Sequence, residues 1–254
     1  MNFLRQLKQR NLLLYWFGWF NMLVGLGCLS GIFLDDEQIL GVSRWLKPMK
    51  FYLSVGLMVW TMDWLLYYLS NTKKVKRYSR LIVFTMFFEN GLILLQAFRG
   101  TTSHFNIYTT TDAMIFNLMG ILIVIFTVTC ILICIAFFGQ QSFDIPAPYL
   151  WGIRLGILFF IIFSLEGGMM LSLLKHTVGA ADGTPGIPVL NWSKQYGDLR
   201  IAHFVGIHSL QVLPVVGYYV AKSKRQIILT SAIYFVAVAF VFIQALRGIS
   251  LFAW

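Results

Sequence analysis

Pairs of basic residues stand at the start of two apolar stretches of this sequence. Lys47 and Lys50 are three positions apart, as are Arg200 and His203, so each pair shares one face of a helix. The first turn of a helix already carries partial positive charge, and further cations there are unfavourable unless an anion answers them. This spacing predicts a bound anion beside each pair.

Two arginines follow glutamines in a repeated five-residue string. Gln96-Ala-Phe-Arg99-Gly100 ends one apolar stretch and Gln244-Ala-Leu-Arg247-Gly248 ends another. Each cation taken alone could also extend to a lipid phosphate or pair with a carboxylate. A duplicated set favours an anionic ligand over these alternatives. The acids available for pairing are Asp35, Asp36, Glu37, Asp112 and Asp198.

Ionisable residues within or near the apolar stretches form a second candidate set. Such groups are costly in lipid, so an ionisable residue in a membrane span usually marks a functional site. Histidine nitrogens and carboxylates are metal ligands, and two histidines can hold a haem axially. A metal or haem held by His104, His203 or His208, with Glu89 or Glu166 as an acid–base group, is therefore one interpretation. An interior histidine with a hydrogen-bond partner is the other.

Several catalytic signatures are absent from the sequence. It contains no Walker A string, no H-E-x-x-H and no G-x-S-x-G, and the last apolar stretch has no lysine for a retinal Schiff base. The protein classes that these strings define are excluded.

The elements that must position these residues are membrane-spanning helices. The chain is 58% hydrophobic and 12% charged, whereas soluble domains carry about 25% charged residues. Seven stretches reach the length of about 20 apolar residues that a crossing needs, which predicts an all-α integral membrane protein with seven transmembrane helices. We place these spans near residues 12–34, 47–69, 80–98, 114–138, 149–174, 199–221 and 227–250.

Charged loops predict the orientation of the spans. Lysines and arginines gather in residues 5–10, 73–80 and 222–225, whereas acids gather in the alternate loops. The positive-inside rule then places the N-terminus inside and the C-terminus outside. Because the net charge of +10 is concentrated in short loops, we set nucleic acid aside as a partner and expect the lipid bilayer and a small anionic molecule.

An internal duplication divides the chain, which we take as a single membrane domain over residues 1–254. The Q-A-x-R-G strings are 148 residues apart, and Leu46-Lys-x-x-Lys-Phe51 matches Leu199-Arg-x-x-His-Phe204 at an offset of 153. Two matches in register predict parallel repeats near 12–100 and 149–250, joined by a linker helix near 114–138. Parallel repeats recur in transporters.

The outer segment 175–198 is rich in turn residues, including Asp182-Gly-Thr-Pro-Gly-Ile-Pro188. A loop of this length is more often functional than a plain connector. We expect it to act as a lid.

Three strings resemble motifs of an uncharacterised family of bacterial multi-pass membrane proteins. They are K-P-x-K-F at 47–51, Q-A-x-R-G-x-x-S-H-F-N at 96–106 and G-D-L-R-x-A-H-F-x-G-x-H at 197–208. The resemblance covers residues 46–217 and implies a bacterial cytoplasmic (inner) membrane location. It brings no activity with it.

These patterns predict binding or transport of a small anionic solute through an outward-facing polar cavity, with Glu89 and His208 as a deeper proton-coupling pair. A membrane enzyme or redox protein that uses the metal or haem is one alternative, and a ligand sensor is another. The residues expected to bind ligand are Lys50, Glu89, Gln96, Arg99, His104, Glu166, Arg200, His203, His208, Gln244 and Arg247.

Overall fold

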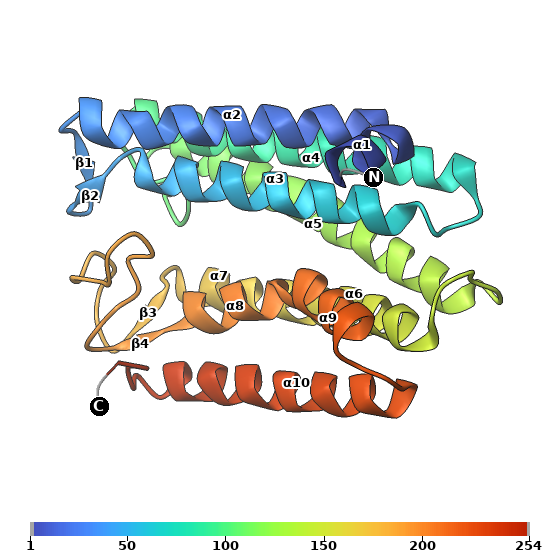
Figure 1. Ribbon diagram of the computed structural model, residues 1–254. Coiled ribbons are helices and arrows are strands. Elements are labelled where there is room, and N and C mark those ends of the chain that lie inside the picture. Colours follow the sequence, from blue (N-terminus) through green and yellow to red (C-terminus); the bar gives the residue numbers. More distant parts are fainter. Residues whose placement is uncertain (1–2, 253–254) are drawn as a thin grey trace. The chain divides into compact units, whose positions relative to one another are not determined.

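A computed structural model describes residues 3–252, which are mostly helical (Figure 1). The chain divides into two compact units, Met1–Gln140 and Gln141–Trp254. The first unit contains helices α1 (Phe3–Arg10), α2 (Leu12–Leu34), α3 (Leu46–Leu66), α4 (Thr72–Phe98) and α5 (Thr110–Gly139), with a small hairpin of β1 (Gln38–Ile39) and β2 (Val42–Ser43). The second contains α6 (Ala147–Leu165), α7 (Gly167–Leu173), α8 (Leu199–Ile207), α9 (Ser209–Tyr219) and α10 (Lys224–Leu246), with an antiparallel pair of β3 (Thr177–Val178) and β4 (Gly197–Asp198).

Short polar side chains begin several of these helices. Asn11, Asn71 and Thr109 precede α2, α4 and α5, and each accepts the backbone N–H three residues further on. A side-chain oxygen at this position satisfies an N–H that has no partner within the helix. Because Asn71 starts α4, this helix is longer than the predicted span and carries basic residues 73–80 in its first turns.

The protein is an all-α, multi-pass membrane protein. Within the described residues, five helical stretches are long and apolar enough to cross a bilayer, and the α8–α9 pair makes a sixth if it counts as one broken span. In the apolar part of each of the five, between 17% and 44% of the residues are buried, so most face outward and need lipid as their solvent. The five are α2, α4, α5, α6 with α7, and α10; the predicted second span, α3, is not among them.

The fifth and sixth predicted spans each contain a break. The helix that starts at Ala147 is interrupted at Glu166, which separates α6 from α7. The helix that starts at Leu199 bends by 43° at His208, between α8 and α9. Pro214 lies six residues after this bend, inside α9, where it provides no N–H for the carbonyl of Leu210.

In the first unit α2 and α3 run side by side along their length (Figure 1). Glycine allows this approach: a Cβ on Gly18 would lie 2.1 Å from the indole nitrogen of Trp60. A Cβ on Gly56 would lie 3.0 Å from the methyl group of Met22. Small residues let membrane helices pack closely where no hydrophobic effect drives them together.

The second unit packs α6 against α8 and α9 by the same means. A Cβ on Gly152 would lie 2.4 Å from the carbonyl oxygen of Leu213, and one on Gly156 would lie 2.8 Å from that of Ser209. The Ser209 hydroxyl also donates a hydrogen bond of 3.1 Å to the Gly156 carbonyl. Backbone contact between α6 and α9 therefore depends on glycine.

Candidate functional site

The first Q-A-x-R-G string forms the cap that ends α4. Gly100 follows Arg99 in a left-handed conformation with φ of 70°, which glycine adopts without steric cost. Its N–H bonds to the Ala97 carbonyl at 3.1 Å. The next N–H, of Thr101, bonds to the Gln96 carbonyl at 3.1 Å. These are the two bonds of a Schellman cap, and they hold Gln96 and Arg99 in adjacent turns.

Asp112, in the first turn of α5, adds a carboxylate to this cap. Its Oδ1 accepts a hydrogen bond from Nε2 of Gln96 at 3.0 Å and one from Nη1 of Arg99 at 2.7 Å. Its Oδ2 accepts the hydroxyl of Thr109 at 2.6 Å. The Asp112 side chain is 7% exposed and that of Arg99 is 36% exposed. Arg99 is therefore neutralised within its own unit, as the pairing alternative predicts.

The second Q-A-x-R-G string ends α10 with the same cap. Gly248 has φ of 74°, and its N–H bonds to the Ala245 carbonyl at 2.9 Å. The N–H of Ile249 bonds to the Gln244 carbonyl at 3.2 Å. In both caps the glutamine side chain also donates to the carbonyl six residues further on, at 3.0 Å in α10 and 3.5 Å in α4. The two strings therefore share backbone and side-chain geometry.

The two caps differ at their arginines. Arg247 is exposed, and within residues 3–252 no carboxylate pairs with it. Gln244 is 9% exposed, and its side-chain amide donates to the Ser250 carbonyl. The α10 cap is therefore the arrangement of the first unit without its carboxylate.

Arg200, another predicted ligand residue, is paired inside the second unit. Its Nε and Nη2 donate to the two oxygens of Asp198 at 2.9 and 2.5 Å, a bidentate contact. Its Nη2 also donates to the Asn191 carbonyl at 2.6 Å. Asp198 is 1% exposed and accepts the N–H of Ser193 at 2.8 Å. Arg200 thus ties the loop 175–198 to the start of α8.

The loop 175–198 folds onto the end of α10. Tyr196 forms an antiparallel bridge with Ile249, just beyond the cap. A Cβ on Gly197 would lie 2.0 Å from the carbonyl oxygen of Ala245, so no other residue fits there without a shift. The loop and the arginine-capped helix end therefore form one structure.

A histidine–carboxylate pair stabilises the first part of this loop. The Nδ1 of His176 lies 2.7 Å from Oδ2 of Asp182, and the backbone N–H groups of His176 and Thr177 also donate to this carboxylate. Burial opposes the charged form of Asp182. The hydrogen bonds and the charge of His176 outweigh it, so the pKa of Asp182 lies below its usual range.

Lys47 and Lys50 lie in the first turn of α3, as predicted. The charge of Lys47 acts on Glu89, a residue of α4 that is 2% exposed. The Oε2 of Glu89 has no hydrogen-bond partner among the described residues. The neighbouring Asn90 donates to Asn21 of α2 at 2.8 Å. Neither asparagine is among the predicted site residues, although an asparagine in an apolar span signals a partner on another helix.

The three candidate histidines make separate contacts. The Nδ1 of His104 lies 3.1 Å from the hydroxyl of the preceding serine. His203 donates from Nδ1 to the Phe163 carbonyl at 2.7 Å, and His208 donates to the Gln211 side-chain oxygen at 3.1 Å. In the part of the chain that the structure describes, no three His, Cys, Asp or Glu side chains gather as metal ligands. Each histidine has the hydrogen-bonded surroundings of the second interpretation.

Glu166 lies at the break between α6 and α7. It is 9% exposed, and neither carboxylate oxygen has a hydrogen-bond partner within residues 3–252. The ring of His203 lies close by, since a Cβ on Gly167 would be 3.6 Å from its Cε1. The structure therefore places His203 of α8 next to the break at which Glu166 lies, so two predicted site residues are close to one another there.

Fold and site together define an all-α multi-pass membrane protein with two arginine-capped helix ends and buried acids in its apolar helices. No protein-family model, curated protein or solved structure matches the chain. Its function must be argued from these residues.

Proposed function

We propose that this protein is a seven-span transporter of a small anionic solute in a bacterial cytoplasmic membrane, with its N-terminus inside and its C-terminus outside. It consists of two copies of a three-helix unit, 12–100 and 149–250, joined by α5. The solute binds at the outer end of α10. The difference between Arg99, which has Asp112, and Arg247, which has no acid within residues 3–252, carries the proposal.

The packing of α3 supports its inclusion as a seventh span. At one end Arg10, next to the start of α2, donates to the Trp64 carbonyl at 3.0 Å. At the other end the Trp45 indole donates to Asp35, at the end of α2, at 2.7 Å. A helix that runs beside α2 from end to end crosses the same thickness. Its 21 residues extend about 31 Å, close to the hydrocarbon thickness of about 30 Å.

The two caps support the duplication, because they repeat the same bonds at the same offset of 148 residues. The second matching string supports it as well. Helices α3 and α8 begin at Leu46 and Leu199, the aligned leucines.

Glycine contacts follow the same relation. Gly18 faces Trp60 in the first unit, and Gly152 faces Leu213 in the second. The two glycines are 134 residues apart. Trp60 and Leu213 are 153 residues apart, which is also the offset between the strings that begin at Leu46 and Leu199. The contact one turn along is between Gly56 and Met22 in the first unit and between Gly156 and Ser209 in the second, and it has the same two offsets. Matching contacts between matching positions are what a duplicated helix pair would retain.

Asp112 indicates the chemistry of the solute. In the first unit its carboxylate accepts hydrogen bonds from Gln96 and Arg99. In the second unit Arg247 occupies the position of Arg99, and a solute carboxylate or phosphate would take the place of the missing acid. Arginine suits such groups because its fork of N–H donors matches two oxygens.

Two buried groups support movement of the solute coupled to protons. Oε2 of Glu89 and Nε2 of His208 are buried without hydrogen-bond partners among the described residues. Both lie in helices that cross the membrane in the proposed topology. Protonatable groups in such positions are typical of proton pathways in transporters.

Binding can be tested with purified full-length protein in neutral detergent. Acetate, succinate and inorganic phosphate are the probes, and the measured quantity is the shift in Tm as each probe is added. We expect at least one probe to raise the Tm of the wild type. Arg247→Gln should weaken the affinity for that probe about tenfold or more, because a hydrogen bond to a charged group is worth about 1.5–3 kcal/mol. The same Tm shift would then need at least about ten times more probe.

Arg225→Gln is the matched control, since Arg225 is an exposed arginine at the opposite end of α10. It should leave the Tm shift unchanged. The probe that binds is then loaded outside proteoliposomes and its uptake is measured. Equal Tm shifts in the wild type and Arg247→Gln would remove the arginine cap from the mechanism. Binding without uptake would favour a sensor over a transporter.

A further inference from the structure

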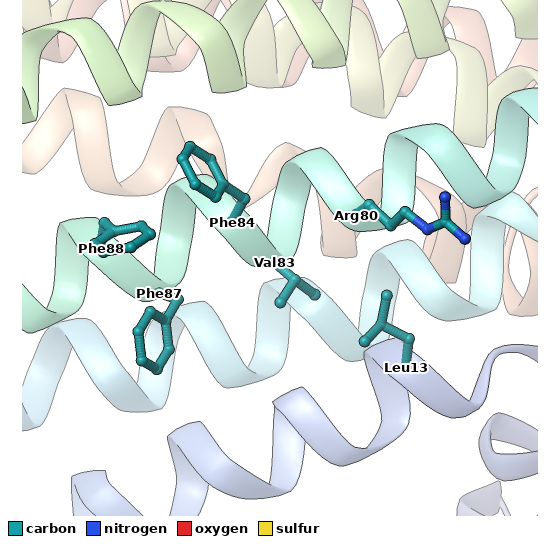
Figure 2. A pocket seen from close by; sticks show the side chains of 6 residues that line it. All are labelled: Leu13, Arg80, Val83, Phe84, Phe87 and Phe88. Atoms are coloured by element: carbon teal, nitrogen blue, oxygen red, sulfur yellow. The ribbon is translucent and has the colours of Figure 1, made fainter.

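A groove runs along the outside of the first unit between α2 and α4. Figure 2 shows the aromatic side chains of α4 along it and a leucine of α2 across from them. The groove is shallow and open, with a volume of about 320 Å³, and an equally open hollow of about 620 Å³ that shares two of its residues continues it along α2. The groove is lined by Leu13, Arg80, Val83, Phe84, Phe87 and Phe88.

The walls of the groove are apolar and accessible. Phe84, Phe87 and Phe88 are between 44% and 50% exposed, so about half of each ring has no protein neighbour. Such surface in a membrane helix must meet lipid or another apolar partner.

The length of the groove matches one leaflet. From Arg80 to Phe88 the helix rises about 12 Å. Half of a hydrocarbon core of about 30 Å is about 15 Å. A single acyl chain of one leaflet would therefore run along the groove with its headgroup at the level of Arg80.

Positive charge stands at the headgroup end. Lys73, Arg77 and Arg80 follow one another at helical spacing on the face of α4 that carries the groove, and all three are exposed. The sequence contains no acid in residues 1–34 or 64–88, the segments that form the groove and its basic end. A phosphate at this level would meet several cations and no carboxylate of these segments.

We propose that this groove binds an anionic phospholipid, with one acyl chain against the phenylalanines of α4 and the phosphate at Arg80. Charge complementarity selects this occupant, because a zwitterionic lipid gains less from three cations and a second copy of the same basic end would be repelled. The site is separate from the arginine caps, and it concerns the first unit alone.

Native mass spectrometry of the purified full-length protein tests the proposal. The probes are phosphatidylglycerol and phosphatidylcholine with identical acyl chains, added at equal concentration. We expect preferential retention of phosphatidylglycerol by the wild type. Arg80→Gln should lower that retention by about fivefold, the value of one basic residue near an anionic lipid.

Two further variants sharpen the test. Lys74→Gln removes one charge from the same part of α4 but from a different face, and it should retain phosphatidylglycerol like the wild type. Val83→Trp, which fills the groove, should lower retention of both lipids. Equal retention of the two lipids by the wild type, or equal losses in Arg80→Gln and Lys74→Gln, would overturn the proposal. A protein dimer that Val83→Trp dissociates would assign the groove to a second copy instead.

Discussion

Nη1 of Arg99 lies 2.7 Å from Oδ1 of Asp112, a residue 13 positions further along the chain and on another helix. The contact joins the end of α4 to the start of α5 and neutralises a cation at the cap. Arg247 has the same cap and no such acid within residues 3–252. A repeated motif thus has a structural role in one unit and a side chain available for a ligand in the other.

Removal of the Asp112 carboxylate should leave a site beside Arg99 and Gln96 that binds a carboxylate ion from solution, such as acetate. We expect Asp112→Ala to lower the Tm, because Arg99 and Gln96 lose their shared acceptor. Acetate in excess should raise the Tm of this variant by more than that of the wild type. Asp144→Ala, a change at an exposed acid, is the control. Equal acetate effects in all three proteins would contradict a carboxylate-shaped site.

A methyl group at the contact between α6 and α9 should destabilise the second unit. Gly152→Ala places a Cβ against the Leu213 carbonyl, and overpacking of this kind costs about 1–3 kcal/mol. Thermal unfolding in detergent measures the loss. Gly120→Ala is the matched control, because a Cβ there meets nothing within 4 Å. A similar Tm for both variants would show that the helices can separate without cost.

The loop 175–198 should become less ordered in acid. Because the pKa of folded Asp182 is depressed, its contribution is complete above the unfolded value of about 3.9 and is lost as the pH falls toward the folded value. Relative to the intrinsic rate at each pH, hydrogen exchange of residues 175–198 should therefore accelerate below about pH 4. Asp182→Asn should accelerate exchange at neutral pH as well, and Asp144→Asn should not. If exchange relative to the intrinsic rate did not change with pH in this range, the His176–Asp182 pair would not be what stabilises the loop.

Single cysteines introduced into the loops should report the proposed topology. Cysteines at Asp36 and Asp182 should react with an impermeant thiol reagent in intact cells, and cysteines at Lys74 and Lys222 only after permeabilisation. Background labelling should be low, because the native cysteines at 28, 130 and 134 are buried. Reaction of positions 36 and 74 from the same side would mean that α3 does not cross the membrane.

Glu89→Gln separates a functional acid from a structural one. One oxygen of this buried carboxylate has no hydrogen-bond partner among the described residues, which is costly, so the neutral isostere should raise the Tm. In proteoliposomes the variant should lose the dependence of uptake on the pH gradient. Glu37→Gln, at an exposed acid, should leave that dependence intact. Normal coupling in Glu89→Gln would transfer the proton role to another group.

Local features of the fold could be predicted from the sequence, because they depend on neighbours in the chain. The apolar stretches indicated membrane helices, and these are confirmed in the coarser form of five or six candidate spans. The string Q-A-x-R-G gives a Schellman cap wherever it ends a helix, since Gly100 and Gly248 can take the positive φ that the cap needs. The breaks at Glu166 and His208 lie inside apolar runs, and hydropathy alone does not reveal them.

The sequence by itself determined the solvent of this protein, the residues that cap its helices and the residues available for ionic contacts. Only the tertiary structure decided that Arg99 meets Asp112, that Arg200 meets Asp198 and that Arg247 meets no acid within residues 3–252. The reason is physical. Hydropathy and capping act over a few residues along one helix, whereas an ion pair forms only where packing brings two side chains within about 4 Å.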